Sequence, residues 1–142
     1  MPGYSGTPLP QKLGVKPGHT VVLIHSTPDL AEVFHPLPEP LDLHQDLPPA
    51  GRCDVILFFT SERAELEERF SELAARLTPA GGLWICWPKR ASGVPTDLNE
   101  NVIRELGLGK GLVDNKVCAV TDIWSGLRFV YRLVDRARLP TN

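Results

Sequence analysis

Three short, uninterrupted apolar runs constrain the fold more than any other feature of this chain. They are HTVVLIHS at residues 19–26, DVILFFT at 54–60 and LWICW at 83–87, all rich in β-branched or aromatic residues. Strands without polar alternation are typical of parallel sheets that helices cover on both faces. These runs therefore predict the central strands of an α/β sheet.

The segments between the runs carry helical signals. SERAELEERFSELAARL, residues 61–77, repeats apolar residues at helical spacing and predicts an amphipathic helix with Ser61 as its N-cap. PDLAEVFH at 28–35 predicts a shorter helix, and LDLHQD at 41–46 a short strand. Strands that alternate with helices indicate a mostly parallel, open sheet.

The second half of the chain is divided by turns. TPAGG at 78–82 predicts a turn into the third apolar run, and Asp97 with Glu100 predicts a capping box for a helix that Gly107 ends. Residues 116–134 predict two strands joined by a turn around Trp124, Ser125 and Gly126, which would form an antiparallel pair at the end of the sheet.

Length and charge bound the classes of function. A chain of 142 residues predicts one domain, which we expect at 19–139, with an N-terminal extension at 1–18 packed on it and a tail at 140–142.

A net charge of −2 argues against nucleic acid or an anionic membrane as partner, and we interpret the C-terminal arginines, Arg128 among them, as a solvated edge. The start lacks the apolar core of a signal peptide, and no run is long enough for a membrane span, so we expect a cytoplasmic protein. Cysteine and histidine spacings predict neither disulfides nor a metal site.

Several motifs carry a resemblance to a known family. KPGHTVVLIHS, CDVILFF, a helix that ends in LTPAGGLWICW and a terminal strand pair together resemble a methyltransferase-like Rossmann fold of minimal length. The start GYSGTPL, the turn WPKRASG, the stretch GLVDNK and the segment WSGL resemble the bacterial family called domain of unknown function 3052. The resemblance covers nearly the whole chain, and it implies a fold without assigning a function.

A methyltransferase-like fold implies S-adenosylmethionine, whose binding needs a glycine-rich loop after the first strand. Here that strand runs into His25, Ser26, Thr27, Pro28 and Asp29. The loop contains no glycine, and proline removes a backbone donor. We therefore expect no cofactor. GLGKG at residues 107–111 follows a helix and so does not form a phosphate-binding loop.

In open α/β sheets, ligands bind at the carboxyl ends of the parallel strands, near the switch in strand order. The candidate ligand-binding residues at those ends are His25, Ser26, Thr27, Thr60, Ser61, Trp87, Lys89 and Ser92. Lys89 supplies a positive charge, the hydroxyl groups supply donors, and helix N–H groups that begin near Pro28, Ser61 and Asp97 favour an anion.

The sequence thus leaves three functional hypotheses open. The first is a non-catalytic protein that binds a small anionic ligand or has a regulatory role, with Lys89 at the site. A second is a protein-interaction or homo-oligomerising module that uses the C-terminal strand pair. The third is a divergent methyltransferase-like enzyme.

Overall fold

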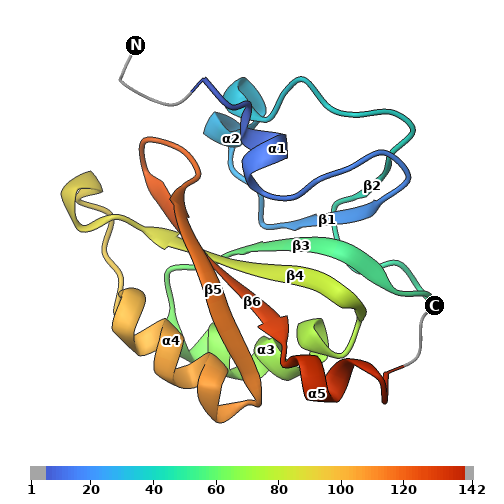
Figure 1. Ribbon diagram of the computed structural model, residues 1–142. Coiled ribbons are helices and arrows are strands. Elements are labelled where there is room, and N and C mark those ends of the chain that lie inside the picture. The colour runs from blue at the N-terminus through green and yellow to red at the C-terminus, as the bar shows by residue number, and fades with distance from the viewer. Residues whose placement is uncertain (1–5, 140–142) are drawn as a thin grey trace.

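The computed structural model describes residues 6–139, which form a six-stranded sheet with helices on both faces (Figure 1). The elements are α1 (Leu9–Lys12), β1 (Thr20–Ile24), α2 (Pro28–Val33), β2 (Asp42–His44), β3 (Cys53–Phe59), α3 (Arg63–Ala74), β4 (Leu77–Pro88), a 3-10 turn (Arg90–Ser92), α4 (Glu100–Gly109), β5 (Leu112–Ala119), β6 (Trp124–Tyr131) and α5 (Leu133–Arg136). No helix within 6–139 is long and apolar enough to cross a membrane.

The strand order is β2-β1-β3-β4-β6-β5. Strands β1 to β4 are parallel, β6 pairs antiparallel with β4, and β5 pairs antiparallel with β6. The predicted class, a mostly parallel open sheet that ends in an antiparallel pair, is confirmed.

Each face of the sheet has its own apolar layer, because successive residues of a strand point to opposite sides. Leu57 of β3 packs in the layer that α1 and α2 cover, while its neighbour Phe58 packs in the layer beneath α3. Trp84, fully buried in the first layer, donates from Nε1 to the carbonyl of Leu13 at 3.0 Å. This bond ties the segment after α1 to the middle of the sheet.

Two predicted turns lie inside strands. TPAGG belongs to β4, whose register against β3 shifts between Cys53 and Val55, so this part of the strand bulges instead of turning. Trp124, Ser125 and Gly126 begin β6, and the connection from β5 is the segment 120–123. The glycines signalled turns, but backbone pairing with neighbouring strands accommodates them.

The predicted helix boundaries also shift. Helix α3 begins at Arg63 with Glu62 at the N-cap, so Ser61 lies one residue too early to cap it. The N-cap of α4 is Asn99, whose side chain accepts from the N–H of Val102 at 2.9 Å, and Asp97 lies outside that helix.

Helix α4 does not end at Gly107 but continues to Gly109. Gly107 lets the Phe129 ring approach the helix, since a Cβ there would lie 2.1 Å from a ring carbon.

Candidate functional site

The parallel strands β1, β3 and β4 end together, and we call this side of the sheet the carboxyl edge. The chain leaves β1 towards β2 and leaves β3 towards β4, so the topological switch lies between β1 and β3. His25, the first residue after β1, has φ +58°, a left-handed conformation that glycine adopts most easily. Its ring lies 5.8 Å from the Phe58 ring between centroids, and its Nδ1 lies 3.4 Å from Glu65 Oε2. The loop thus has a glycine-like backbone that bears an imidazole.

Thr60 and His25 both contact the carboxylate of Glu65. The buried hydroxyl of Thr60 donates to Glu65 Oε1 at 2.5 Å, and its oxygen accepts from the N–H of Glu62 at 3.2 Å. One carboxylate therefore joins the ends of β1 and β3 to the first turn of α3. The His25 ring and the Thr60 hydroxyl therefore both have partners within the chain.

The other candidates near the switch point, Ser26, Thr27 and Ser61, are half-buried. Thr27 holds the N-cap position of α2, where its hydroxyl bonds to the Asp29 carboxylate, and Ser26 precedes it. The carbonyl of Ser61 accepts from the Thr96 hydroxyl at 2.7 Å. These contacts anchor loops to the sheet.

At two of the three helix starts predicted to receive an anion, those of α3 and α4, a backbone N–H already has a side-chain acceptor. The N–H of Arg63, at the start of α3, donates to Asp97 Oδ1 at 2.7 Å. At the start of α4, the N–H of Val102 donates to Asn99. Side chains of the chain itself therefore hold these donors.

Lys89 begins the loop after β4, and its N–H donates to the carbonyl of Ile123 at 2.8 Å. Its carbonyl accepts from the Ser92 hydroxyl at 2.7 Å, while Trp87, only 7% exposed, has its side chain in the core. The predicted residues thus do not form one site. His25 and Thr60 lie at the switch point, whereas Lys89 and Ser92 lie after the end of β4. The side chain of Trp87 belongs to the core.

Lys89 lines a cleft of about 550 Å³, the Lys89 cleft, between α1, α2 and the β5–β6 connection. Its charged lining residues are Lys12, Lys89, Asp29, Glu32 and Asp122, so carboxylates outnumber ammonium groups. Burial raises the pKa of Asp29, but hydrogen bonds from Thr27, Thr121 and the backbone outweigh it and hold that pKa below its usual value. The carboxylate is therefore ionised at neutral pH, and the cleft has no excess of positive charge.

A different charge balance is found on the side where β1, β3 and β4 begin, the amino edge. In the register of the antiparallel strands, Trp84 lies opposite Arg128, and Arg128 lies opposite Lys116. Like charges directly opposite each other destabilise a sheet. Both cationic residues lie on the sheet face that α1 covers, since Trp84 packs there.

Arg128 extends across Gly82, and a Cβ at that position would lie 2.3 Å from its Nε. The side chain is half-buried, and among residues 6–139 its guanidinium has neither a hydrogen bond nor an ion pair. Burial, together with the charge of Arg136, lowers the pKa of Arg128. A guanidinium partly removed from water and left without a carboxylate costs free energy unless an anion neutralises it.

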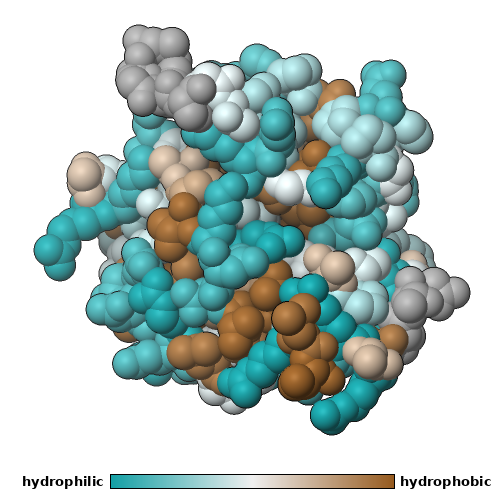
Figure 2. Space-filling model, in the orientation of Figure 1, coloured by the Kyte–Doolittle hydropathy of each residue, from teal (hydrophilic) through white to brown (hydrophobic). Residues whose placement is uncertain are grey.

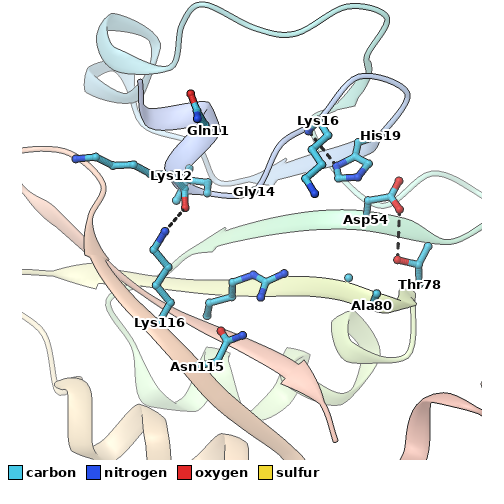
Figure 3. A pocket seen from close by; sticks show the side chains of 13 residues that line it. Gln11, Lys12, Gly14, Lys16, His19, Asp54, Thr78, Ala80, Asn115 and Lys116 are labelled. Atoms are coloured by element: carbon cyan, nitrogen blue, oxygen red, sulfur yellow. Dashed lines mark hydrogen bonds between the residues drawn. The ribbon is translucent and has the colours of Figure 1, made fainter. Parts of the chain in front are cut away.

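Hydrophilic residues gather between α1 and strands β5 and β6, around the cleft that contains Arg128 (Figure 2). This amino-edge cleft has a volume of about 450 Å³. Lys16 extends its ammonium into it, whereas the ammonium of Lys12 points away and its carbonyl accepts from Lys116 Nζ at 2.8 Å (Figure 3). Its single carboxylate, Asp54, lies at the opposite end from Lys116. Cationic side chains therefore outnumber carboxylates among the described lining residues, with Lys116 at the end opposite Asp54 and Lys16 on the His19 side.

The sequence offered weak signals for this second cleft. The sequence predicts a solvated edge for the C-terminal arginines, but Arg128 is half-buried. It lies on the sheet face opposite to Leu127 and Phe129, which is the face that contains Trp84. The Gly81-Gly82 pair was interpreted as a turn. Only the register of β4 against β6 shows that Gly82 makes room for a long side chain.

Comparisons with known proteins identify the fold alone. No model of a known protein family matches the chain, and no curated protein matches its sequence. Among solved structures, a SAM-dependent methyltransferase from Aquifex aeolicus matches with a TM-score of 0.58 and 15% identity over 84% of this chain and 85% of that one. Magnesium protoporphyrin IX methyltransferase from Synechocystis PCC 6803 gives 0.52 and 15% over 82% and 75%, and N-methyltransferase NodS from Bradyrhizobium japonicum WM9 gives 0.53 and 13% over 84% and 88%. The chain has a methyltransferase-like Rossmann fold.

That fold implies S-adenosylmethionine, and the residues at the switch point do not fit it. The loop after β1, where S-adenosylmethionine needs glycine, instead begins with His25, whose ring lies against Phe58 and beside Glu65. Metal ligands are likewise lacking: residues 6–139 contain no group of three or more His, Cys, Asp or Glu side chains placed to hold an ion.

Proposed function

We propose that this chain is a non-catalytic domain that binds a small anion, and that the anion lies in the amino-edge cleft. The observation that carries the proposal is the pair Lys116 and Arg128, placed opposite each other in the sheet while the guanidinium has no partner among residues 6–139. An anion between them would remove the repulsion and supply charge-assisted hydrogen bonds. The Lys89 cleft, in which acids outnumber bases, is a poorer place for it.

The experiment is a calorimetric titration with inorganic phosphate and with citrate at constant ionic strength. Replacement of Arg128 by Gln should weaken binding by about tenfold or more, since a charged hydrogen bond contributes about 1.5–3 kcal/mol. Arg132→Gln is the matched control, because Arg132 is exposed and lies outside the cleft. An equal loss in both variants, or no saturable binding of either anion, would contradict the proposal.

The methyltransferase alternative is tested separately. Because His25 fills the position of the glycine loop, we expect S-adenosylmethionine and S-adenosylhomocysteine to show no saturable binding at micromolar concentrations. Tight binding of either compound would revive an enzymatic function and displace the present proposal.

A second candidate function is protein interaction through the C-terminal segment. Leu133 and Val134 of α5 are 77% and 72% exposed, directly after the terminal strand pair. Exposed apolar side chains of this size on a soluble domain are a frequent mark of a contact surface when they form a patch. If they mediate self-association, wild-type protein should sediment as an oligomer and Leu133→Ser with Val134→Ser as a monomer.

We also propose membership of the domain of unknown function 3052 family and a cytoplasmic location. Two of the motifs that support the first lie side by side in the fold, since Trp87 and Pro88 of WPK pair with Ser125 and Trp124 of WSGL. Detection of the protein in a membrane or extracellular fraction would contradict the second.

A further inference from the structure

The two ends of the amino-edge cleft differ in chemistry, and this difference selects a class of ligand. Lys116, opposite Arg128 in the register of the sheet, lies at one end, and Asp54, the only carboxylate among the described lining residues, lies at the other end with Lys16 on its side. Asp54 accepts from the N–H of Thr20 at 2.8 Å with one oxygen and from the Thr78 hydroxyl at 3.3 Å with the other. A carboxylate has about four acceptor sites, so each oxygen can accept a further donor.

Asp54 can accept a hydrogen bond from a hydroxyl group of a ligand whose anionic group lies on Arg128 and Lys116. The cleft volume of about 450 Å³ lies within the range of small-molecule sites and exceeds what a single phosphate fills. The one aromatic ring in the lining is that of His19, whose Nδ1 accepts from the N–H of Lys16 at 3.2 Å. A neutral imidazole in that tautomer has a donor at Nε2, which suits an oxygen of the ligand.

We infer that the ligand of the amino-edge cleft is a phosphorylated sugar or polyol. Its phosphate would lie on Arg128 and Lys116, and its hydroxyl groups would donate to Asp54, which Figure 3 shows at the end of the cleft opposite Lys116. This inference rests on the proposed anion-binding function and specifies the ligand of that same site. A nucleotide fits less well, because among residues 6–139 no tryptophan, tyrosine or phenylalanine lines the cleft as a surface for base stacking.

The test compares ribose 5-phosphate with inorganic phosphate by calorimetry at constant ionic strength. Wild-type protein should bind ribose 5-phosphate about tenfold more tightly, as expected for hydrogen bonds to a charged acceptor. In Asp54→Asn the preference should fall to about threefold or less, while inorganic phosphate binds as well as before or better because a negative charge is gone.

A second variant separates ligand recognition from the structural role of Asp54. Thr78→Val removes the internal hydroxyl donor but keeps the carboxylate, so the preference for ribose 5-phosphate should persist. This variant also keeps the inference testable if Asp54→Asn fails to fold, because loss of the preference in Thr78→Val would overturn it.

Three other results would overturn the inference while leaving anion binding intact: equal affinity for the two ligands in the wild type, an unchanged preference in Asp54→Asn, or binding of ADP as tight as that of ribose 5-phosphate. Failure of every phosphate compound to bind would instead overturn the proposed function on which the inference rests.

Discussion

The two edges of the sheet use their polar residues in opposite ways. At the carboxyl edge, the His25 ring, the Thr60 hydroxyl and the Glu65 carboxylate contact one another, and the first N–H of α3 already has an acceptor in Asp97. At the amino edge, Arg128 is half-buried without a partner among residues 6–139. Polar groups that are paired within the chain stabilise the fold, whereas a half-buried guanidinium that has no protein partner and lines a cleft is free to bind an anion. We therefore expect substitutions at the carboxyl edge to change stability and substitutions at the amino edge to change binding.

The largest expected effect is that of Gly82→Ala on anion affinity. The added Cβ would lie 2.3 Å from Arg128 Nε, so the guanidinium must leave its position. Affinity for phosphate should fall by about 10–100-fold, as for the loss of a charged hydrogen bond. Calorimetry on the two single variants and the Gly82→Ala/Arg128→Gln double variant should show no further loss in the double variant.

Gly109→Ala is the control for this substitution, because a Cβ there meets no atom within 4 Å. It should leave phosphate affinity unchanged. Full affinity in Gly82→Ala would mean that the position of the guanidinium over Gly82 plays no part in binding.

Thr60→Val should have the next largest effect, and on stability. The substitution keeps the shape but removes the donor to Glu65 and the acceptor of the Glu62 N–H. The free energy of unfolding should fall by about 1–3 kcal/mol, the cost of unpaired buried polar groups. Urea denaturation measures it, with Thr60→Ser, which retains the hydroxyl, expected to lose less.

Phosphate affinity in Thr60→Val should equal that of the wild type. A variant that lost affinity but not stability would reverse the roles assigned to the two edges.

The sequence predicts the strands of the sheet more accurately than the side-chain contacts of the site, and particular residues show why. The run DVILFFT predicts a buried strand because no polar residue lies between Asp54 and Thr60, as expected for a strand covered on both faces. The acceptor for the first N–H of α3, in contrast, is Asp97, which is 34 positions away from Arg63. The neighbours of Gly82 and Arg128 depend in the same way on strand register. Local pattern predicts which segments form elements, while long-range pairing decides which side chains meet between them.

Asp97→Ala tests this distinction and should have an effect of intermediate size. Because its Oδ1 accepts from the N–H of Arg63, the substitution should cost about 0.5–2 kcal/mol, as for a lost helix cap. Hydrogen exchange should then accelerate in the first turn of α3, whereas Asn99→Ala should accelerate exchange in the first turn of α4. Faster exchange in α4 alone after Asp97→Ala would restore the capping box that the sequence predicts.

Lys89→Met should have the smallest effect, and it compares the two edges most directly. The contacts of Lys89 that hold the loop are made by its backbone, which the substitution leaves in place. Lys89 lines a cleft together with Asp29, Glu32 and Asp122, whose carboxylates would repel an anion there. We expect the free energy of unfolding to change by less than about 0.5 kcal/mol, as for most surface substitutions, and phosphate affinity to stay as in the wild type. Calorimetry on Lys89→Met beside Arg128→Gln gives the comparison: if the first variant lost affinity and the second kept it, the anion would belong at the carboxyl edge, where ligands of open α/β sheets usually bind.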